Sequence, residues 1–142
     1  MTRKRVLFIC THNSARSQIA EAWLKRIGGP AFDVESAGLG FGTLKPLVIE
    51  AMQEVGIDLS GKTTQTVADV LKSERRFDYV ITFYDQKKAG QCPTFPGEIT
   101  RLHWDIPERP KSPAPKKEQL AHVRNVRELI KRHVEEWLAQ NP

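Results

Sequence analysis

Cys10 and Arg16 enclose a short polar segment whose residue types could bind and attack an oxyanion. A continuous apolar run, residues 6–9, precedes this segment, and apolar residues at helical spacing follow it from Ala20 onward. In a loop that leads from a strand into a helix N-terminus, backbone N–H groups point toward a bound anion. The sequence therefore predicts an oxyanion-binding loop with Cys10 at its base, made of Thr11, His12, Asn13, Ser14, Ala15, Arg16 and Ser17.

Four of these residues suit particular tasks in such a loop. Cys10 faces the loop N–H groups, which favour the thiolate, so we expect it to act as a nucleophile. The planar guanidinium of Arg16 can hold two oxygens of a tetrahedral oxyanion. Asn13 tolerates the left-handed backbone that a tight anion loop needs. Ser17 can donate a hydrogen bond to the Cys10 sulfur and cap the helix. The alternative, a strand-end cysteine beside a surface arginine, is disfavoured by this combination.

The elements that must position the loop alternate along the chain, which is typical of a layered α/β fold with a parallel sheet. The predicted strands are residues 6–9, 32–35, 78–82 and 99–102, and their crossovers should be right-handed. We expect one domain over residues 1–142. Four groups of apolar residues at helical spacing predict four helices, the last of them over residues 116–138. The groups are Ala20, Trp23, Leu24 and Ile27; Val48, Ala51, Met52 and Val55, with Gly56 as the cap; Val67, Val70 and Leu71; and Val126, Ile130, Val134 and Trp137.

The composition is that of an ordinary globular domain with a positive charge. The chain has 142 residues, 27% of them charged, with a formal net charge of +5. This charge suits an anionic substrate, and no nucleic-acid recognition motif accompanies it. No apolar run approaches the roughly 20 residues of a membrane span, and the apolar stretch 6–10 is too short for a signal peptide. We therefore expect a cytoplasmic protein in which Cys10 and Cys92 form no structural disulfide.

Several segments resemble low-molecular-weight protein tyrosine phosphatases and the arsenate reductases related to them. Residues 6–22 are similar to the active-site segment of these proteins, and residues 54–60 to the exit of their second helix. Ser36-Ala37-Gly38 resembles their serine loop, which implies that Ser36 supports Asn13. Residues 92–97 and 103–104 resemble the arsenate-reductase branch. The resemblance covers nearly the whole chain and implies a four-stranded parallel sheet with helices on both faces, in flavodoxin-like layers.

Two reactions are compatible with this resemblance. In both, Cys10 attacks a tetrahedral centre, the loop stabilises its oxygens, and a carboxylic acid protonates the leaving oxygen. The acid position of the family falls on Glu108, and Asp105, three residues earlier, could serve instead. Phosphatases of the family follow their acid with tyrosines that flank an aryl substrate, whereas residues 109–111 are Arg-Pro-Lys. The sequence therefore favours arsenate reduction over phosphatase action on small or aryl phosphates.

Arsenate reduction requires a second thiol to attack the adduct between Cys10 and arsenic. Thioredoxin-coupled relatives carry two further cysteines after the third strand. Cys92 matches the second of them, and Tyr84 stands where the first would be. Either Cys92 or an external reductant attacks, such as glutathione with glutaredoxin, thioredoxin or mycothiol. We expect a monomer with no bound cofactor. A third interpretation is an anion-binding regulatory module without catalysis.

A metal ion is not expected, although some members of the reductase branch bind potassium beside the loop. The resemblance assigns that site to positions that are Asn13, Glu21 and Ser36 in this chain. The fourth position, where an aspartate would be expected, is Gln65. The sequence therefore predicts no metal.

Overall fold

The computed structural model describes residues 4–11, 13, 15–40, 42–83, 97–106 and 115–140. Its centre is a parallel sheet of four strands in the order β2-β1-β3-β4. The four-stranded parallel sheet implied by the resemblance is therefore confirmed. The strands are β1 (Lys4–Cys10), β2 (Phe32–Gly38), β3 (Tyr79–Thr82) and β4 (Thr100–His103).

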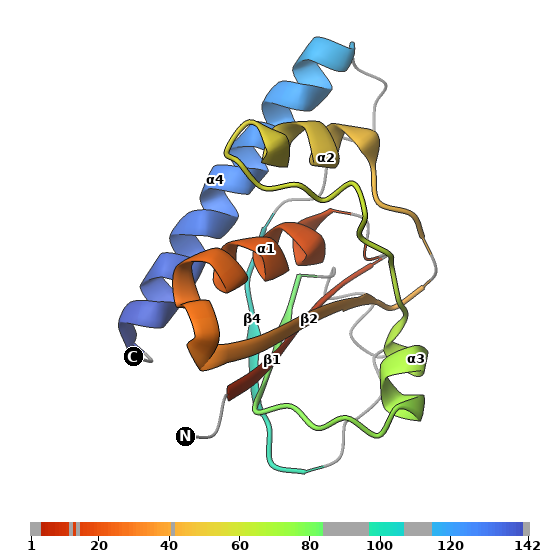
Figure 1. Cartoon of the computed structure of the whole chain (residues 1–142), viewed down its shortest axis with the longest axis vertical. Coiled ribbons are helices and arrows are strands. Elements are labelled where there is room, and N and C mark those ends of the chain that lie inside the picture. Colours follow the sequence, from red (N-terminus) through yellow and green to blue (C-terminus); the bar gives the residue numbers. More distant parts are fainter. Residues whose placement is uncertain are drawn as a thin grey trace.

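Helices cover both faces of the sheet, as expected. Figure 1 shows α1, α2 and α4 grouped along one side of the sheet and α3 apart from them. Within the described ranges, no helix is both long and apolar enough to cross a membrane. The helices are α1 (Arg16–Gly28), α2 (Pro46–Gln53), α3 (Val67–Lys72) and α4 (Lys116–Gln140), with a short 3-10 turn, η1 (Gly29–Ala31), after α1.

Strand β1 is buried on both faces, which explains its continuous apolar run. Val6, Phe8 and Cys10 point into the core beneath α1, α2 and α4. Leu7 and Ile9 point into the smaller core beneath α3. Because β1 lies between β2 and β3, Cys10 reaches the carboxyl edge of the sheet near its middle. Open α/β sheets bind their ligands at this edge.

Strand β2 is longer than the sequence pattern predicts. The predicted strand stopped at residue 35, yet β2 continues to Gly38, which pairs with Cys10 in the parallel register. Ser36 and Ala37 are almost fully buried between the layers. Ser36, which the resemblance placed in a serine loop, is therefore a strand residue, and the loop begins only after Gly38.

The predicted cap of α2 is confirmed by the hydrogen bonds at its end. The backbone N–H of Ile57 donates to the carbonyl of Met52 at 3.0 Å, and that of Gly56 donates to Gln53 at 3.0 Å. Gly56 has a φ of 81°, which glycine adopts without steric cost. This pattern is the Schellman motif that commonly ends helices.

Most residues of the predicted apolar stripes are buried, and one residue of the stripe on α1 is exposed. Trp23 and Leu24 are buried, whereas Ile27, predicted to belong to the same stripe, is 39% exposed. Ile27 lies in the last turn of α1, beyond the part of the helix that the core covers. On α4 the predicted inner residues are all buried: Val126, Ile130, Val134 and Trp137.

We predict unequal effects for the same truncation at the two isoleucines. Ile130 is 0% exposed, so Ile130→Ala should lower the free energy of unfolding by about 2–5 kcal/mol through lost burial and the cavity left behind. Ile27→Ala is the matched control and should cost under about 1 kcal/mol. Urea unfolding monitored by circular dichroism measures both. Equal losses would contradict the placement of α4 against the core.

Candidate active site

Cys10 ends β1 at the carboxyl edge of the sheet, and α1 begins six residues later at Arg16. Cys10, Thr11 and Asn13 are buried, with exposed fractions of 3%, 6% and 0%, and Ala15 is partly buried. The residues that follow β2 are hydrogen-bonded to the start of the loop. The backbone N–H of Leu39 donates to the Cys10 carbonyl at 3.0 Å, and that of the next residue donates to the Thr11 carbonyl at 2.9 Å. His12 and Ser14 of the predicted loop lie outside the described residues.

The side chain of Asn13 makes hydrogen bonds to three other residues. Its φ is 55°, the left-handed conformation expected for it. Its amide nitrogen donates to the hydroxyl of Ser17 at 2.8 Å. Its amide oxygen accepts from the side chain of Gln18 at 3.1 Å and from the backbone N–H of Gln65 at 3.0 Å. The strained backbone of Asn13 is therefore held by contacts from two separate segments.

Ser17 contacts the sulfur of Cys10, as the sequence predicts. The Ser17 oxygen lies 2.8 Å from the Cys10 sulfur. Since that oxygen already accepts a hydrogen bond from Asn13, its own proton is available to the sulfur. The Ser17 hydroxyl can therefore donate to a Cys10 thiolate, which has no proton of its own to offer. The predicted capping role was wrong: Ala15 is the N-cap, and Ser17 lies inside the first turn of α1.

Ser36 does not support Asn13, which the resemblance had implied. Its hydroxyl donates instead to the carboxylate of Glu21 at 2.6 Å, because that buried acceptor lies directly across from it on α1. The supports of Asn13 are the two glutamines, Gln18 and Gln65. Sequence reasoning missed both, since neither the Gln18 side-chain amide nor the Gln65 backbone N–H carries a periodic signal.

Arg16 joins the loop to the ends of β3 and β4. It is 7% exposed, and its Nη1 atom donates to the carbonyl of Phe83 and, at 3.1 Å, to that of Ile106. Phe83 directly follows β3, and Ile106 lies three residues after β4. The guanidinium is thus held at the carboxyl edge, beside the base of the oxyanion loop.

The remaining predicted residues divide into described and undescribed ones. Asp105 is exposed and precedes Ile106, so the Arg16 contact fixes its segment next to the loop. Glu108 and Cys92 lie outside the described residues. Among the residues that are described, no group of three or more His, Cys, Asp or Glu side chains is arranged to hold a metal ion.

The chain is similar to known proteins over nearly its whole length. Residues 5–141 match the family model of low-molecular-weight phosphotyrosine protein phosphatases. An arsenate reductase of Halalkalibacterium halodurans is 36% identical over 134 residues, which is 94% of each chain. The match spans nearly the whole of both proteins.

Two solved structures are also similar. One is an arsenate reductase in its phosphate-binding state, with a TM-score of 0.75, 30% identity and coverage of 96% of this chain and 98% of that one. The other is a thioredoxin-dependent arsenate reductase of Corynebacterium glutamicum, with a TM-score of 0.72, 31% identity and coverage of 97% of this chain and 61% of that one. This chain belongs to the low-molecular-weight phosphotyrosine protein phosphatase family. The Halalkalibacterium halodurans protein and these two structures are arsenate reductases.

We predict that Ser17→Ala slows the alkylation of Cys10 by iodoacetamide at pH 7. The substitution removes the hydroxyl donor to the sulfur, and a hydrogen bond to a charged group contributes about 1.5–3 kcal/mol. The rate should fall by about tenfold or more, measured on the Cys10 peptide by mass spectrometry. In the wild-type protein, added phosphate should slow the same reaction by occupying the loop.

Ser60→Ala, at an exposed turn, is the control and should leave the rate unchanged. If wild-type Cys10 reacts no faster than a free peptide cysteine, or if phosphate has no effect, the oxyanion loop is incorrectly assigned.

Proposed function

We propose that this chain reduces arsenate to arsenite with electrons supplied by thiols. Membership of the family and the arsenate reductases similar to it over nearly their full length support the proposal. The observation that carries it is the contact between the Cys10 sulfur and the Ser17 hydroxyl at the base of a buried loop. That contact suits a cysteine that must attack as a thiolate.

In the first step, the Cys10 thiolate attacks arsenic and forms a sulfur–arsenic bond. One arsenate oxygen leaves as water after a carboxylic acid protonates it. Arg16 and the backbone N–H groups of residues 11–17 stabilise charge on the remaining oxygens, where preorganised donors have their largest effect. Arsenic remains pentavalent at this stage, since no electrons have yet been transferred to it.

In the second step, another thiolate attacks the Cys10 sulfur. A disulfide forms, the sulfur–arsenic bond breaks, and its electron pair stays on arsenic, which leaves as trivalent arsenite. Two thiols are thereby oxidised for each arsenate that is reduced. Either Cys92 or an external thiol supplies the second sulfur. The protein therefore needs a reductant to return it to the thiol state.

A redoxin or a small thiol is the partner that this reaction requires. Thioredoxin is one candidate, because a similar structure is a thioredoxin-dependent arsenate reductase. Glutathione with glutaredoxin and mycothiol are the others, since the chain has only two cysteines and lacks the third of a complete internal relay. A reducing cytoplasm would keep all of these systems supplied with electrons.

Purified protein should produce arsenite from arsenate when a matching reductant is present. Thioredoxin with its reductase, glutathione with glutaredoxin, and mycothiol are tested in parallel, and arsenite is measured by chromatography. Cys10→Ser should abolish turnover, because serine is a far weaker nucleophile at neutral pH. The reductant system that supports turnover identifies the partner.

Cys92→Ser separates the two routes to the disulfide. Loss of multiple turnovers, with the first attack retained, makes Cys92 the resolving thiol; unchanged turnover makes the external thiol the second nucleophile. If no reductant supports arsenite release but Cys10 is required for hydrolysis of an aryl phosphate, the chain is a phosphatase and the proposal is wrong.

The carboxylic acid can be identified by paired amide substitutions. We expect Glu108→Gln to lower kcat by about 100-fold, the order of magnitude of general acid catalysis. Asp105→Asn should change kcat by less than about threefold, because Asp105 is exposed and Glu108 occupies the family's acid position. Single-turnover kinetics of adduct formation gives the relevant rate. The reverse ranking would assign the acid to Asp105.

A further inference from the structure

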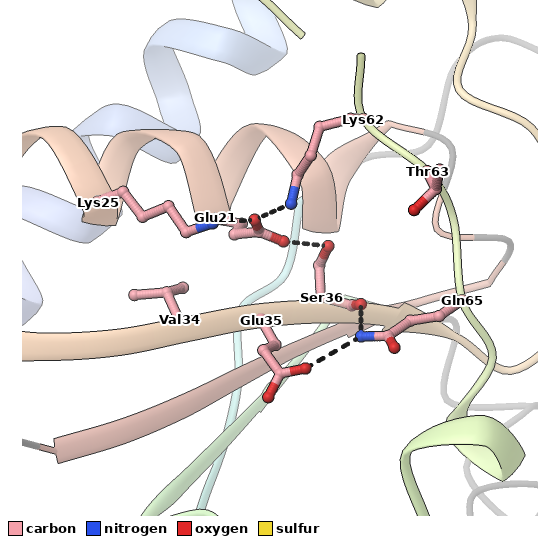
Figure 2. Close-up of a pocket in the computed structure, with 8 residues that line it drawn as sticks. All are labelled: Glu21, Lys25, Val34, Glu35, Ser36, Lys62, Thr63 and Gln65. Atoms are coloured by element: carbon pink, nitrogen blue, oxygen red, sulfur yellow. Dashed lines mark hydrogen bonds and ion pairs between the residues drawn. The ribbon is translucent and has the colours of Figure 1, made fainter. Parts of the chain in front are cut away.

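Glu21 is a buried carboxylate on α1 that the proposed reaction does not use. Its side chain is 3% exposed, and its Oε1 atom accepts a hydrogen bond from the Ser36 hydroxyl at 2.6 Å. Its Oε2 atom contacts the ammonium groups of both Lys25 and Lys62. Figure 2 shows the three charged groups converging beside the segment that carries Gln65. They line a polar pocket with a volume of about 190 Å³.

The burial of Glu21 makes a positively charged partner necessary. Burial by itself would raise the pKa of Glu21, because a carboxylate loses hydration away from water. Hydrogen bonds from Lys25, Lys62 and Ser36 outweigh burial and hold the pKa of Glu21 below its ordinary value. Glu21 is therefore ionised at neutral pH. Removing an essential partner would leave a buried charge without compensation, which is strongly unfavourable.

The two lysines hold Glu21 in different ways. Lys25 lies one turn further along the same helix, and its side chain is 51% exposed, so this pair connects two residues of α1 only. Lys62 reaches Glu21 from the segment after α2, 41 residues away in the sequence, and its side chain is 33% exposed. The Lys62 contact therefore links a separate segment to α1, whereas the Lys25 contact stays within one helix.

The segment that Lys62 anchors forms the backing of the oxyanion loop. The carbonyl of Thr63 accepts a hydrogen bond from the side chain of Gln18 at 3.2 Å. The backbone N–H of Gln65 donates to the Asn13 side chain at 3.0 Å. A displacement of residues 62–65 would therefore move the groups that hold Asn13, and Asn13 holds the hydroxyl next to the nucleophile.

A potassium ion, which some relatives bind beside this loop, does not fit the arrangement. Hard cations take oxygen ligands. Here the Lys62 ammonium contacts the Glu21 oxygen that a cation would need. Gln65 presents an amide N–H, which donates to the Ser36 carbonyl at 2.9 Å, where an aspartate would have offered an oxygen.

We propose that Lys62 is a positioning residue whose ammonium group supplies, from within the chain, the charge that ties residues 62–65 to α1. By fixing this segment, Lys62 holds the loop in its anion-binding shape without a bound metal ion. The inference rests on the proposed function in one respect: it takes residues 10–17 as an oxyanion site. It does not depend on which oxyanion is the substrate or on the reductant.

The test measures how much phosphate is needed to slow the alkylation of Cys10 by half, in NaCl, KCl and NH₄Cl at equal ionic strength. For the wild-type protein this concentration should be the same in all three salts. For Lys62→Met it should rise about tenfold in NaCl, as is typical when a residue that orients a binding group is lost. Ammonium, which replaces the missing charged group, should return this phosphate concentration to the wild-type value, and potassium should return it in part.

Lys25→Met is the matched control, since it removes the same charge from the same carboxylate oxygen. It should behave as the wild-type protein in every salt. Lys62→Arg keeps the positive charge and should remain insensitive to the cation. Equal effects of Lys25→Met and Lys62→Met, or a Lys62→Met defect that no cation relieves, would overturn the assignment.

The double variant Glu21→Gln/Lys62→Met covers the case in which Lys62→Met does not fold. A neutral amide needs no cationic partner, so the double variant should fold and bind phosphate equally in the three salts. Cation dependence in the double variant, or failure of both variants to fold, would count against the inference. If phosphate fails to protect Cys10 even in the wild-type protein, the oxyanion site itself is wrong; if only the Lys62 variants behave unexpectedly, the proposed function stands without this inference.

Discussion

The shape of the oxyanion loop depends on the side-chain amide of Asn13. A non-glycine residue with a φ of 55° is uncommon, and a fully buried amide without partners would be costly. Both demands are met because the amide donates to Ser17 and accepts from Gln18 and Gln65. Asn13 is therefore held in place by contacts within the chain, and the proposed reaction requires such preorganisation, because fixed donors stabilise a developing charge without having to reorient.

The core beneath this network explains why the loop is located at the middle of the sheet. Because β1 is buried on both faces, the strand is confined between two layers, and Cys10 has no freedom to shift along it. Arg16 then links the start of α1 to the ends of β3 and β4 through the carbonyls of Phe83 and Ile106. Cys10, the Arg16 guanidinium and the described segment that contains Asp105 and Ile106 thus meet at one edge.

Two carboxylates of the protein, Glu54 and Glu21, illustrate how burial changes the consequence of an ion pair. Hydrogen bonds from Arg124 and Arg127 lower the pKa of Glu54 to about 2, and this cluster joins α2 to α4 at the surface. Water and salt screen such an exposed pair, so its loss would change the stability of the protein little. Glu21 is buried behind the loop, and its contact with Lys62 joins α1 to the segment whose backbone holds Asn13, so this contact bears on the geometry of the site.

Local patterns in the sequence were sufficient to predict the parallel sheet, the loop after β1, the left-handed Asn13 and the inner face of α4, because strand and helix periodicities are properties of neighbouring residues. Only the tertiary structure decided that Ser36 donates to Glu21, that Gln18 and Gln65 hold Asn13, and that Ile27 is exposed. Lys62 and Glu21 are 41 residues apart, and nothing local distinguishes this lysine from a solvated one. The partner of a polar side chain is decided by which segments pack together, and that choice is made by the whole core rather than by the residues beside it in the chain.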